Sequence, residues 1–327
     1  MPRAPLLLLL LLACGPDADD PPVLEAHGEP FRRCAILDPS GEEEWRALGL
    51  TFRRKGFELT VDGRSDGKAV ILALAGIEEA ADDNLANVRT ILGLAADRGL
   101  DAVLVAGGLG PDERQARVIL GALGAARAPV LVSLGESEPL EGFRAAFAAA
   151  RRRAPNLVDM SRVRAAKLPD LSVVSLPGYH EPHYLRHRAE GCGVVPEDVR
   201  LLPRLGRGLP APVVLLSAAP PRGDGAHAID RARGGVDIGS RPLARAVRAG
   251  RFAFGVFGHV YEAGGNATKV DGRTRVAPGE WSDSLLVNPG AVEAIPYELS
   301  TGGRAQGLGA LVEIEGGRAR YRVLRGR

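Results

Sequence analysis

Residues 69–110 read AVILALAGIEEAADDNLANVRTILGLAADRGLDAVLVAGGLG, and this stretch decides the fold. Two short apolar runs, at 69–74 and 102–106, flank a segment at 83–98 whose apolar residues recur with helical spacing. Continuous apolar strands separated by helices indicate a sheet that is covered by helices. The pattern therefore predicts an α/β fold.

The same alternation continues along the chain. Further strands are expected at 130–134, 172–176, 213–217 and 252–257, with helices at 112–123 and 140–152. The C-terminal part is expected to be mostly β, with strands at 284–288, 308–314 and 319–324. Because functional sites in α/β folds lie at the carboxyl ends of strands, the residues just after each apolar run should decide function.

Composition narrows the class of protein. The chain has 327 residues, of which 45% are hydrophobic and 25% charged, and its formal net charge is +2. This length allows one large domain or two small ones with ample core. A charge so close to neutral gives no electrostatic case for nucleic-acid binding.

The N-terminus has the features of a secretory signal. Arg3 is followed by the leucine run 6–12, which is too short to span a bilayer. The sequence Leu11-Leu12-Ala13-Cys14 resembles the lipobox of bacterial lipoproteins. That resemblance implies cleavage before Cys14, lipidation of its thiol and attachment to a membrane, in an exported protein that faces the periplasm or the cell exterior. It does not say which membrane holds the lipid. The alternative is an ordinary cleaved signal with a chance cysteine.

Four segments are expected from these patterns. Residues 1–13 form the lipoprotein signal peptide, and residues 14–30, rich in Pro, Asp, Gly and Ala, form a flexible tether. Residues 31–67 form an N-terminal extension in which alternation at 57–61 and two Asp-Gly pairs suggest a hairpin. Residues 68–327 form the main domain.

Two cysteines remain once Cys14 is lipidated, namely Cys34 and Cys192. In an exported chain an even pair can form one disulfide. Two buried free thiols are the other possibility, and sequence cannot show whether the two side chains are close enough to bond.

Five short loops follow five of the expected strands. In chain order they read Ala75-Gly76-Ile77-Glu78, Gly107-Gly108-Leu109-Gly110, Gly135-Glu136-Ser137-Glu138, Ser217-Ala218-Ala219-Pro220-Pro221 and Gly258-His259-Val260-Tyr261. Their order and spacing resemble the calcineurin-like metallophosphoesterase family, whose corresponding loops read D-x-H, G-D, G-N-H-[DE], a single H, and G-H-x-H. The resemblance covers roughly residues 69–288 and is strengthened by Asn288-Pro289-Gly290. It implies a four-layer α/β/β/α sandwich.

The family's chemistry needs two divalent cations bridged by a carboxylate. By resemblance, the ligand positions of the family correspond here to Gly76, Glu78, Gly108, Glu136, Ser137, Ala218, His259 and Tyr261. Glycine and alanine side chains offer no ligand atom, and only His259 remains an unambiguous ligand. The glycine at the bridging position, Gly108, is the most damaging change. The sequence therefore predicts that the two-metal site does not assemble and that no cofactor is bound.

An alternative keeps one metal. Carboxylates and one imidazole, from Glu78, Glu136, Glu138 and His259 with Tyr261, would bind one divalent cation such as Mn, Zn or Fe if they converged. The competing interpretation is that the glutamates are solvated loop residues and that His259 is hydrogen-bonded to a neighbouring loop.

Two further loops carry titratable residues. Tyr179-His180-Glu181-Pro182-His183, followed by Arg186 and His187, is rich in imidazoles, a type that is more often exposed than metal-binding. Asp224, His227, Asp230 and Asp237 lie in a loop that we expect to cap the old active-site cleft.

Two functional classes follow. The first is a membrane-tethered, catalytically inactive homologue of metallophosphoesterases that binds a small molecule or a protein partner in the envelope. The second is a phosphoester hydrolase with a reduced or rearranged metal site. The sequence names neither the ligand nor the oligomeric state.

Overall fold

A computed structural model of the chain describes residues 23–26 and 29–327. The predicted signal peptide, Cys14 and most of the predicted tether lie outside these residues. Within the described part of the chain, no helix combines the length and the apolar character needed to cross a membrane.

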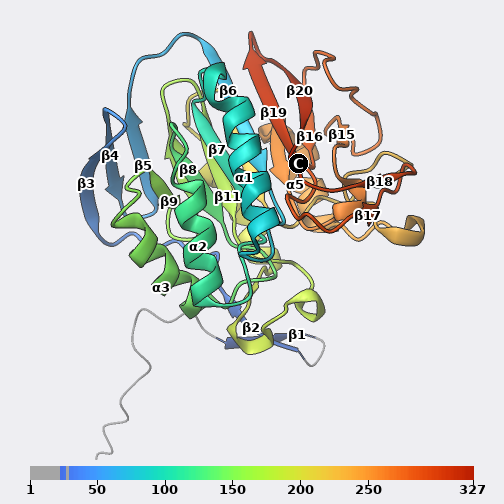
Figure 1. Ribbon diagram of the computed structural model, residues 1–327, viewed down its shortest axis with the longest axis horizontal. Helices are drawn as coiled ribbons and strands as arrows, with labels where there is room; N and C mark the ends of the chain where they lie inside the picture. The colour runs from blue at the N-terminus through green and yellow to red at the C-terminus, as the bar shows by residue number, and fades with distance from the viewer. Residues whose placement is uncertain (1–22, 27–28) are drawn as a thin grey trace, which may run out of the picture.

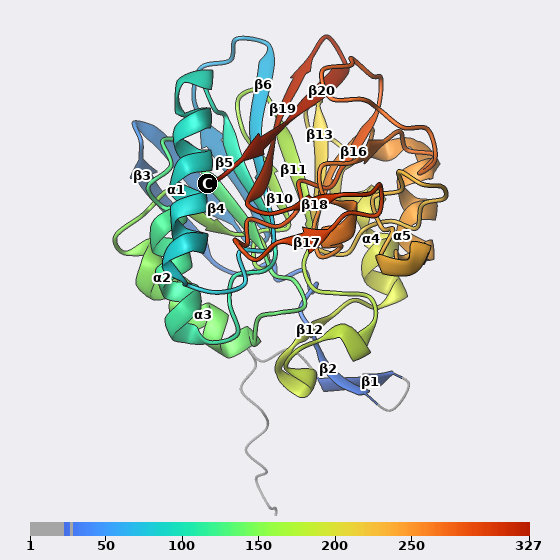
Figure 2. The same ribbon diagram turned by 45° about the vertical axis from the view of Figure 1, so that its right-hand side comes forward.

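Two large sheets form the centre of the molecule, and two small sheets lie outside them (Figures 1 and 2). The six-stranded sheet has the order β20 (Arg318–Arg325), β19 (Leu308–Glu315), β6 (Lys68–Leu74), β7 (Ala102–Ala106), β8 (Val130–Ser133), β9 (Leu157–Asp159). The nine-stranded sheet has the order β15 (Ala267–Thr268), β16 (Leu285–Val287), β14 (Phe254–Phe257), β13 (Val213–Ser217), β11 (Ser172–Leu176), β10 (Ala165–Lys167), β5 (Glu58–Asp62), β4 (Leu50–Lys55), β3 (Glu42–Ala47). The small sheets comprise β1 (Val23–Ala26), β2 (Glu29–Arg33) and β12 (Cys192–Gly193), and the pair β17 (Tyr297–Glu298) and β18 (Arg304–Ala305).

Helices cover the outer faces of both large sheets. The α-helices are α1 (Asp82–Ala95), α2 (Glu113–Leu123), α3 (Leu140–Arg151), α4 (Pro196–Leu205) and α5 (Arg241–Ala246), which continues as a π-helical turn, η5 (Val247–Arg251). Short 3₁₀ turns are η1 (Ala96–Arg98), η2 (Pro182–Tyr184), η3 (Arg188–Glu190), η4 (Arg233–Gly235) and η6 (Tyr261–Ala263). Figure 2 shows α1, α2 and α3 on one side of the sheets and α4 and α5 on the other.

Strand β6 shows why the sequence builds layers. Alternate side chains point to opposite faces, so Ile71 and Ala73 enter the core between the two sheets, whereas Leu72 and Leu74 pack under the helices α1 to α3. All four side chains are buried completely. A third core joins α4 and α5 to the nine-stranded sheet. The architecture is the predicted four-layer α/β/β/α sandwich.

The N-terminal part differs from the prediction. The tether was expected to extend to residue 30, but Val23–Ala26 and Glu29–Arg33 pair as antiparallel strands. The reason is Phe31, which is buried beside Tyr179 and Leu185 and so draws the segment onto the domain.

The predicted extension at residues 31–67 is also more than a hairpin. Strands β3, β4 and β5 form an antiparallel meander, and β5 pairs in parallel with β10. Residues 42–62 therefore extend the nine-stranded sheet, and the boundary expected between residues 67 and 68 runs through continuous structure.

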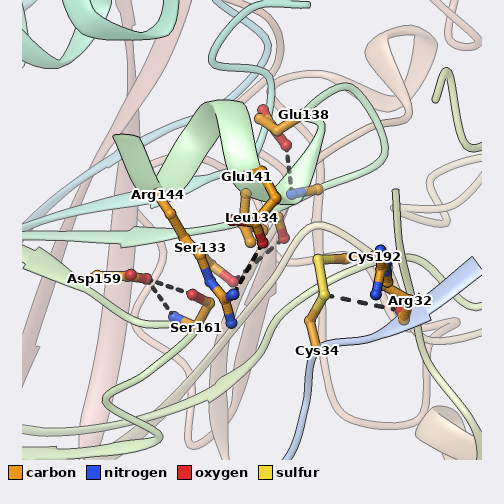
Figure 3. Close-up of a disulfide and its surroundings, with 11 residues drawn as sticks. Arg32, Cys34, Ser133, Leu134, Glu138, Glu141, Arg144, Asp159, Ser161 and Cys192 are labelled. Atoms are coloured by element: carbon orange, nitrogen blue, oxygen red, sulfur yellow. Dashed lines mark hydrogen bonds and ion pairs between the residues drawn. A yellow bond between two sulfur atoms is a disulfide. The ribbon is translucent and has the colours of Figure 1, made fainter. Parts of the chain in front are cut away.

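A disulfide joins Cys34 to Cys192 (Figure 3), so the structure has the first of the two states that the sequence left open. It links the segment after β2 to β12, next to the end of β8. Close by, the fully buried Arg164 guanidinium donates to the carbonyl oxygens of Ala35 and Ser175. Covalent and hydrogen bonds thus hold the N-terminal segment against the loops that follow the strands.

Candidate functional site

The five loops predicted from the sequence meet at one end of the two sheets. Within the first sheet, the N–H of Gly76 donates to Gly107 O (3.2 Å), and the N–H of Gly107 donates to Ser133 O (3.1 Å). Across the sheets, a Cβ added to Gly258 would lie 2.2 Å from the carbonyl oxygen of Ala106. Parallel strands that end at a shared edge therefore bring all eight predicted positions together.

Gly76 and Gly108 occupy the space where the resemblance places two metal-binding carboxylates. Both have positive φ, 56° and 76°, a region that favours glycine. A Cβ on Gly108 would lie 2.5 Å from Gly76 Cα and 2.8 Å from Glu78 Oε1. A Cβ on Gly76 would lie 2.9 Å from both Ala291 Cβ and Tyr261 Cε1. The backbone atoms of the two loops are so close that neither position has room for a side chain.

Ala218 closes the same region from the second sheet. It is fully buried, and its Cβ would lie 3.1 Å from a Cβ added at either Gly107 or Gly135. Small residues from three loops therefore pack directly on one another. An imidazole, which the resemblance expects in place of Ala218, does not fit between them.

Glu136 and His259 form a buried ion pair at the centre of the cluster. His259 Nδ1 lies 3.1 Å from Glu136 Oε1. Burial alone would raise the pKa of Glu136, but the neighbouring imidazole lowers it to about 2. Burial alone would lower the pKa of His259, but Glu136 and then Glu78 raise it. Each charge thus stabilises the other, as buried charges require.

His259 is also fixed by its surroundings. Its φ of 65° lies in the left-handed region, which non-glycine residues rarely adopt. Its ring packs on Tyr179, with centroids 4.2 Å apart, and meets Tyr184 at 5.5 Å. The histidine predicted to be hydrogen-bonded to a neighbouring loop is therefore paired with the third loop and enclosed by tyrosines.

Glu78 is buried rather than solvated. Ser137 Oγ lies 3.1 Å from Glu78 Oε2 and 3.1 Å from Glu136 Oε1. Arg186 Nη2 donates to Glu78 Oε2 at 3.1 Å, and the Tyr261 hydroxyl also hydrogen-bonds this carboxyl group. Burial, and then repulsion from Glu136, raise the pKa of Glu78. Glu78 therefore holds a proton more readily than Glu136 does.

Glu138 accepts hydrogen bonds from the backbone of two loops. One carboxyl oxygen accepts from the N–H of Leu109 and the other from the N–H of Gly135, at 2.8 Å for the latter. Burial, and then Glu136, raise the pKa of Glu138 to about 8. This residue ties the second loop to the third, so both of its oxygens are occupied.

The residues present do not fit a two-metal centre, because the carboxylates at positions 76 and 108 are replaced by backbone in contact. In the described residues, no group of three or more His, Cys, Asp or Glu is arranged to hold a metal ion. One polar atom stands apart: Glu136 Oε2 is buried and has no hydrogen-bond partner.

The other titratable loops have other roles. In the histidine-rich loop, Arg186 reaches Glu78, and His183 pairs with Glu181 at 3.6 Å. In the loop expected to cap the cleft, Asp224 pairs with Arg273 and Asp237 with Arg231. Sequence reasoning missed the contribution of Arg186, because its partner lies 108 positions away.

The Asn288-Pro289-Gly290 motif holds loops together. The Asn288 amide donates to Val260 O (2.8 Å) and Ile229 O (3.1 Å), and its oxygen accepts from the N–H of Gly290. The loop that carries His259 is thereby bound to the segment after β16.

No family model matches the sequence, and no curated protein does. Solved structures do match. The protein TT1561 of Thermus thermophilus is 16% identical, with a TM-score of 0.53 over 79% of this chain and 99% of that one. A dimetal phosphatase from Danio rerio is 12% identical (TM-score 0.46, 79% and 99% covered), and a purple acid phosphatase from yellow lupin is 9% identical (0.46, 83% and 55%). At such identities the likeness is one of fold alone, and of these three matches only TT1561 has a TM-score above 0.5, so the chain shares the fold of that protein.

The contact between Gly76 and Gly108 predicts the effect of restoring a side chain. Gly108→Ala should be less stable than Gly49→Ala, because Gly49 also has a positive φ (76°) but has open space around its Cβ. Backbone strain alone should cost Gly49→Ala about 1–2 kcal/mol, and overpacking should add about 1–3 kcal/mol at Gly108. Denaturant unfolding of the two variants measures the difference. Equal losses would show that the backbones separate freely.

Glu138 predicts a dependence of stability on pH. Its folded pKa of about 8 exceeds the unfolded value of about 4.3, so its contribution is fully present below the unfolded pKa and is lost as pH rises through 8. In Glu138→Gln, the unfolding free energy should fall less steeply between about pH 4.3 and pH 8 than in the wild type. At low pH the unfolding free energy of this variant should be about 1–3 kcal/mol below that of the wild type, because the NH₂ group of the glutamine side chain faces a backbone N–H.

The exposed Glu141 provides the control for this measurement. Unfolding free energies of Glu141→Gln, followed by denaturation over the same pH range, should keep the wild-type slope. An unchanged slope in Glu138→Gln would mean that Glu138 is already ionised at neutral pH.

Proposed function

We propose that the chain is a membrane-tethered, catalytically inactive homologue of the metallophosphoesterases, which acts by binding a small molecule or a protein partner in the cell envelope. Its attachment is a lipid on Cys14, and it faces the periplasm or the cell exterior. Neither nucleic acid nor a metal cofactor takes part.

The close contact of Gly76 with Gly108 carries this proposal. A working two-metal site needs a bridging carboxylate, and at these positions the backbone leaves no room even for a Cβ. The remaining ligand types are used within the protein: His259 and Glu136 neutralise each other, and Glu138 accepts two backbone N–H groups. Such internal pairing is what a permanently metal-free cluster requires.

The position of the N-terminal strands supports a tether. Strand β1 begins at Val23, soon after Cys14, and Phe31 of β2 is buried beside Tyr179, whose ring packs on His259. A lipid on Cys14 would therefore hold the loop end of the sheets near the bilayer surface.

One observation favours a second function, a metal-dependent phosphoester hydrolase with a reduced site. Glu78, Glu136 and His259 do converge, since Ser137 bridges the two carboxyl groups and Glu136 contacts the imidazole. Glu136 Oε2, buried without a partner, is an atom to which a single cation such as Mn, Zn or Fe would bind.

Metal content separates the two functions. After the full-length protein is dialysed against Mn, Zn and Fe, we expect less than about a tenth of an equivalent of metal, because the residues present cannot build the centre. Inductively coupled plasma mass spectrometry measures it, with an active phosphatase of the same fold as the control. One tightly held equivalent that is lost in Glu78→Ala or His259→Ala would establish the hydrolase instead.

Lipidation is tested through Cys14. Wild-type protein expressed in bacteria should sediment with membranes, and mass spectrometry of its N-terminal peptide should show acyl chains on Cys14. Cys14→Ser should move to the soluble fraction, because a polar hydroxyl replaces the acylated thiol. Wild-type protein that is soluble and cleaved elsewhere would contradict the tether.

A further inference from the structure

A pocket of about 410 Å³ lies beside the His259 cluster, between the histidine-rich loop and the segment that leads into α5. The side chains that matter to its chemistry belong to His180, Glu181, His183, Tyr184, Arg222 and Arg241. This volume suits a small organic molecule rather than a bare ion. None of these residues occupies a metal-ligand position of the family.

Unpaired positive charge distinguishes this pocket. Within the described part of the chain, neither Arg222 nor Arg241 makes a side-chain hydrogen bond or ion pair. Other arginines of the same region do find acidic partners, as Arg231 does with Asp237. The one carboxylate of the pocket, Glu181, pairs with His183. Among the described residues, two arginines thus line the cavity without an ion pair of their own.

A buried carboxylate binds the backbone on which the two arginines are carried. One oxygen of Asp230 accepts from the N–H of Gly223 at 2.9 Å, and the other accepts from the N–H of Gly239 at 2.8 Å. The N–H of Arg222 also donates to Ser240 O (3.0 Å). Asp230 is fully buried, so it fixes the backbone next to Arg222 and just before Arg241. Such preorganisation reduces the entropy that binding costs.

An aromatic wall completes the pocket. The rings of His183 and Tyr184 are in contact at a tilt of 39°, with centroids 4.0 Å apart, and Tyr184 is 37% exposed. Deeper, His180 hydrogen-bonds the backbone of Ile238, and burial lowers the pKa of His180 to about 4. His180 is therefore neutral at pH 7, and the positive charge of the pocket comes from the arginines.

We propose that this pocket binds a small molecule that carries a phosphate monoester, with the phosphate between Arg222 and Arg241 and the organic part against Tyr184. A phosphate monoester carries nearly two negative charges at neutral pH and so matches two guanidinium groups. The planar guanidinium fork also donates two parallel hydrogen bonds to phosphate oxygens. The inference rests on the proposed function in one respect: the ligand is held and is not hydrolysed.

Two sources share this chemistry. One is a soluble phosphate monoester, and the other is the phosphate of an anionic lipid headgroup, which a tether on Cys14 would bring near the pocket. The test must therefore present the phosphate in both forms.

Phenyl phosphate is a suitable probe, because its ring can pack on Tyr184. Isothermal titration of the full-length protein in an uncharged detergent should give saturable binding, with a dissociation constant of about 1 mM or tighter. Arg222→Ala and Arg241→Ala should each weaken it about tenfold or more, because each removes a charge-assisted contact. Arg245→Ala, an exposed arginine on the same helix outside the pocket, should bind as wild type does.

Circular dichroism and denaturant unfolding of each variant check that the fold is kept, and Arg222→Lys should recover part of the affinity. Saturable binding that survives in the double Arg222→Ala/Arg241→Ala variant would overturn the proposal, because the ligand would then bind elsewhere. No saturable binding at about 10 mM, a tenfold excess over the expected constant, would overturn it as well.

The lipid source is tested by competition. The protein is reconstituted in phosphatidylcholine vesicles with and without phosphatidic acid, a lipid with a phosphate monoester headgroup, and titrated with phenyl phosphate. Weaker apparent binding only with phosphatidic acid assigns the pocket to a lipid headgroup, and equal binding assigns it to soluble esters. Both results support the phosphate site.

The result that contradicts the pocket differs from the result that contradicts the proposed function. If phenyl phosphate is converted to phenol by metal-loaded protein, the inactive homologue is wrong. If metal content and turnover stay negligible but no arginine-dependent binding occurs, only the pocket assignment is wrong.

Discussion

The contact between the backbones of Gly76 and Gly108 sets the conditions for the whole loop end of the molecule. With these two residues in the left-handed region, the N–H groups of Ile77 and Glu78 both donate to Gly108 O, at 2.8 and 2.9 Å. The ends of β6 and β7 are therefore joined directly. Backbone hydrogen bonds thus hold the first and second loops together at the positions where the resemblance expects two carboxylates.

The loop end also holds three buried carboxyl groups, whose charges must be balanced within the protein. A buried carboxylate without a partner is costly, and the three glutamates of the cluster each meet that cost differently. Glu136 pairs with His259, Glu78 receives Arg186 and hydroxyl groups, and Glu138 accepts backbone N–H groups. The pKa values diverge accordingly, with that of Glu136 lowered and that of Glu138 raised. The pKa of Glu136 thus moves in the opposite direction to the pKa values of Glu78 and Glu138 because the neighbours of these three side chains differ.

The sequence pattern predicts the individual strands and the α/β class, since strands buried on both faces are continuous apolar runs, as β6 and β7 show. The second sheet, and with it the four-layer sandwich, followed only from the family resemblance. The meander at residues 42–62 was underestimated because it lies at a sheet edge, where Arg53 and Glu44 meet in solvent and weaken the apolar signal. The sequence also predicts the five loops and the ligand types that they lack. It does not predict the contact of Gly76 with Gly108 or the bond between Arg186 and Glu78, because each depends on which distant segments the fold brings together.

The phosphate pocket and the loops that carry Gly76 and Gly108 are positioned by different contacts. Asp230, which belongs to neither the first nor the second loop, binds the backbone next to Arg222 and just before Arg241. The contact between Gly76 and Gly108 is therefore not among the contacts that position this backbone. The two regions still touch, since the ring of Tyr184 lines the pocket and meets His259. A ligand against Tyr184 would therefore lie next to a histidine that is fixed by its ion pair with Glu136. Because this ion pair on one side and the hydrogen bonds of Asp230 on the other already order the surroundings of the pocket, binding there would cost less entropy.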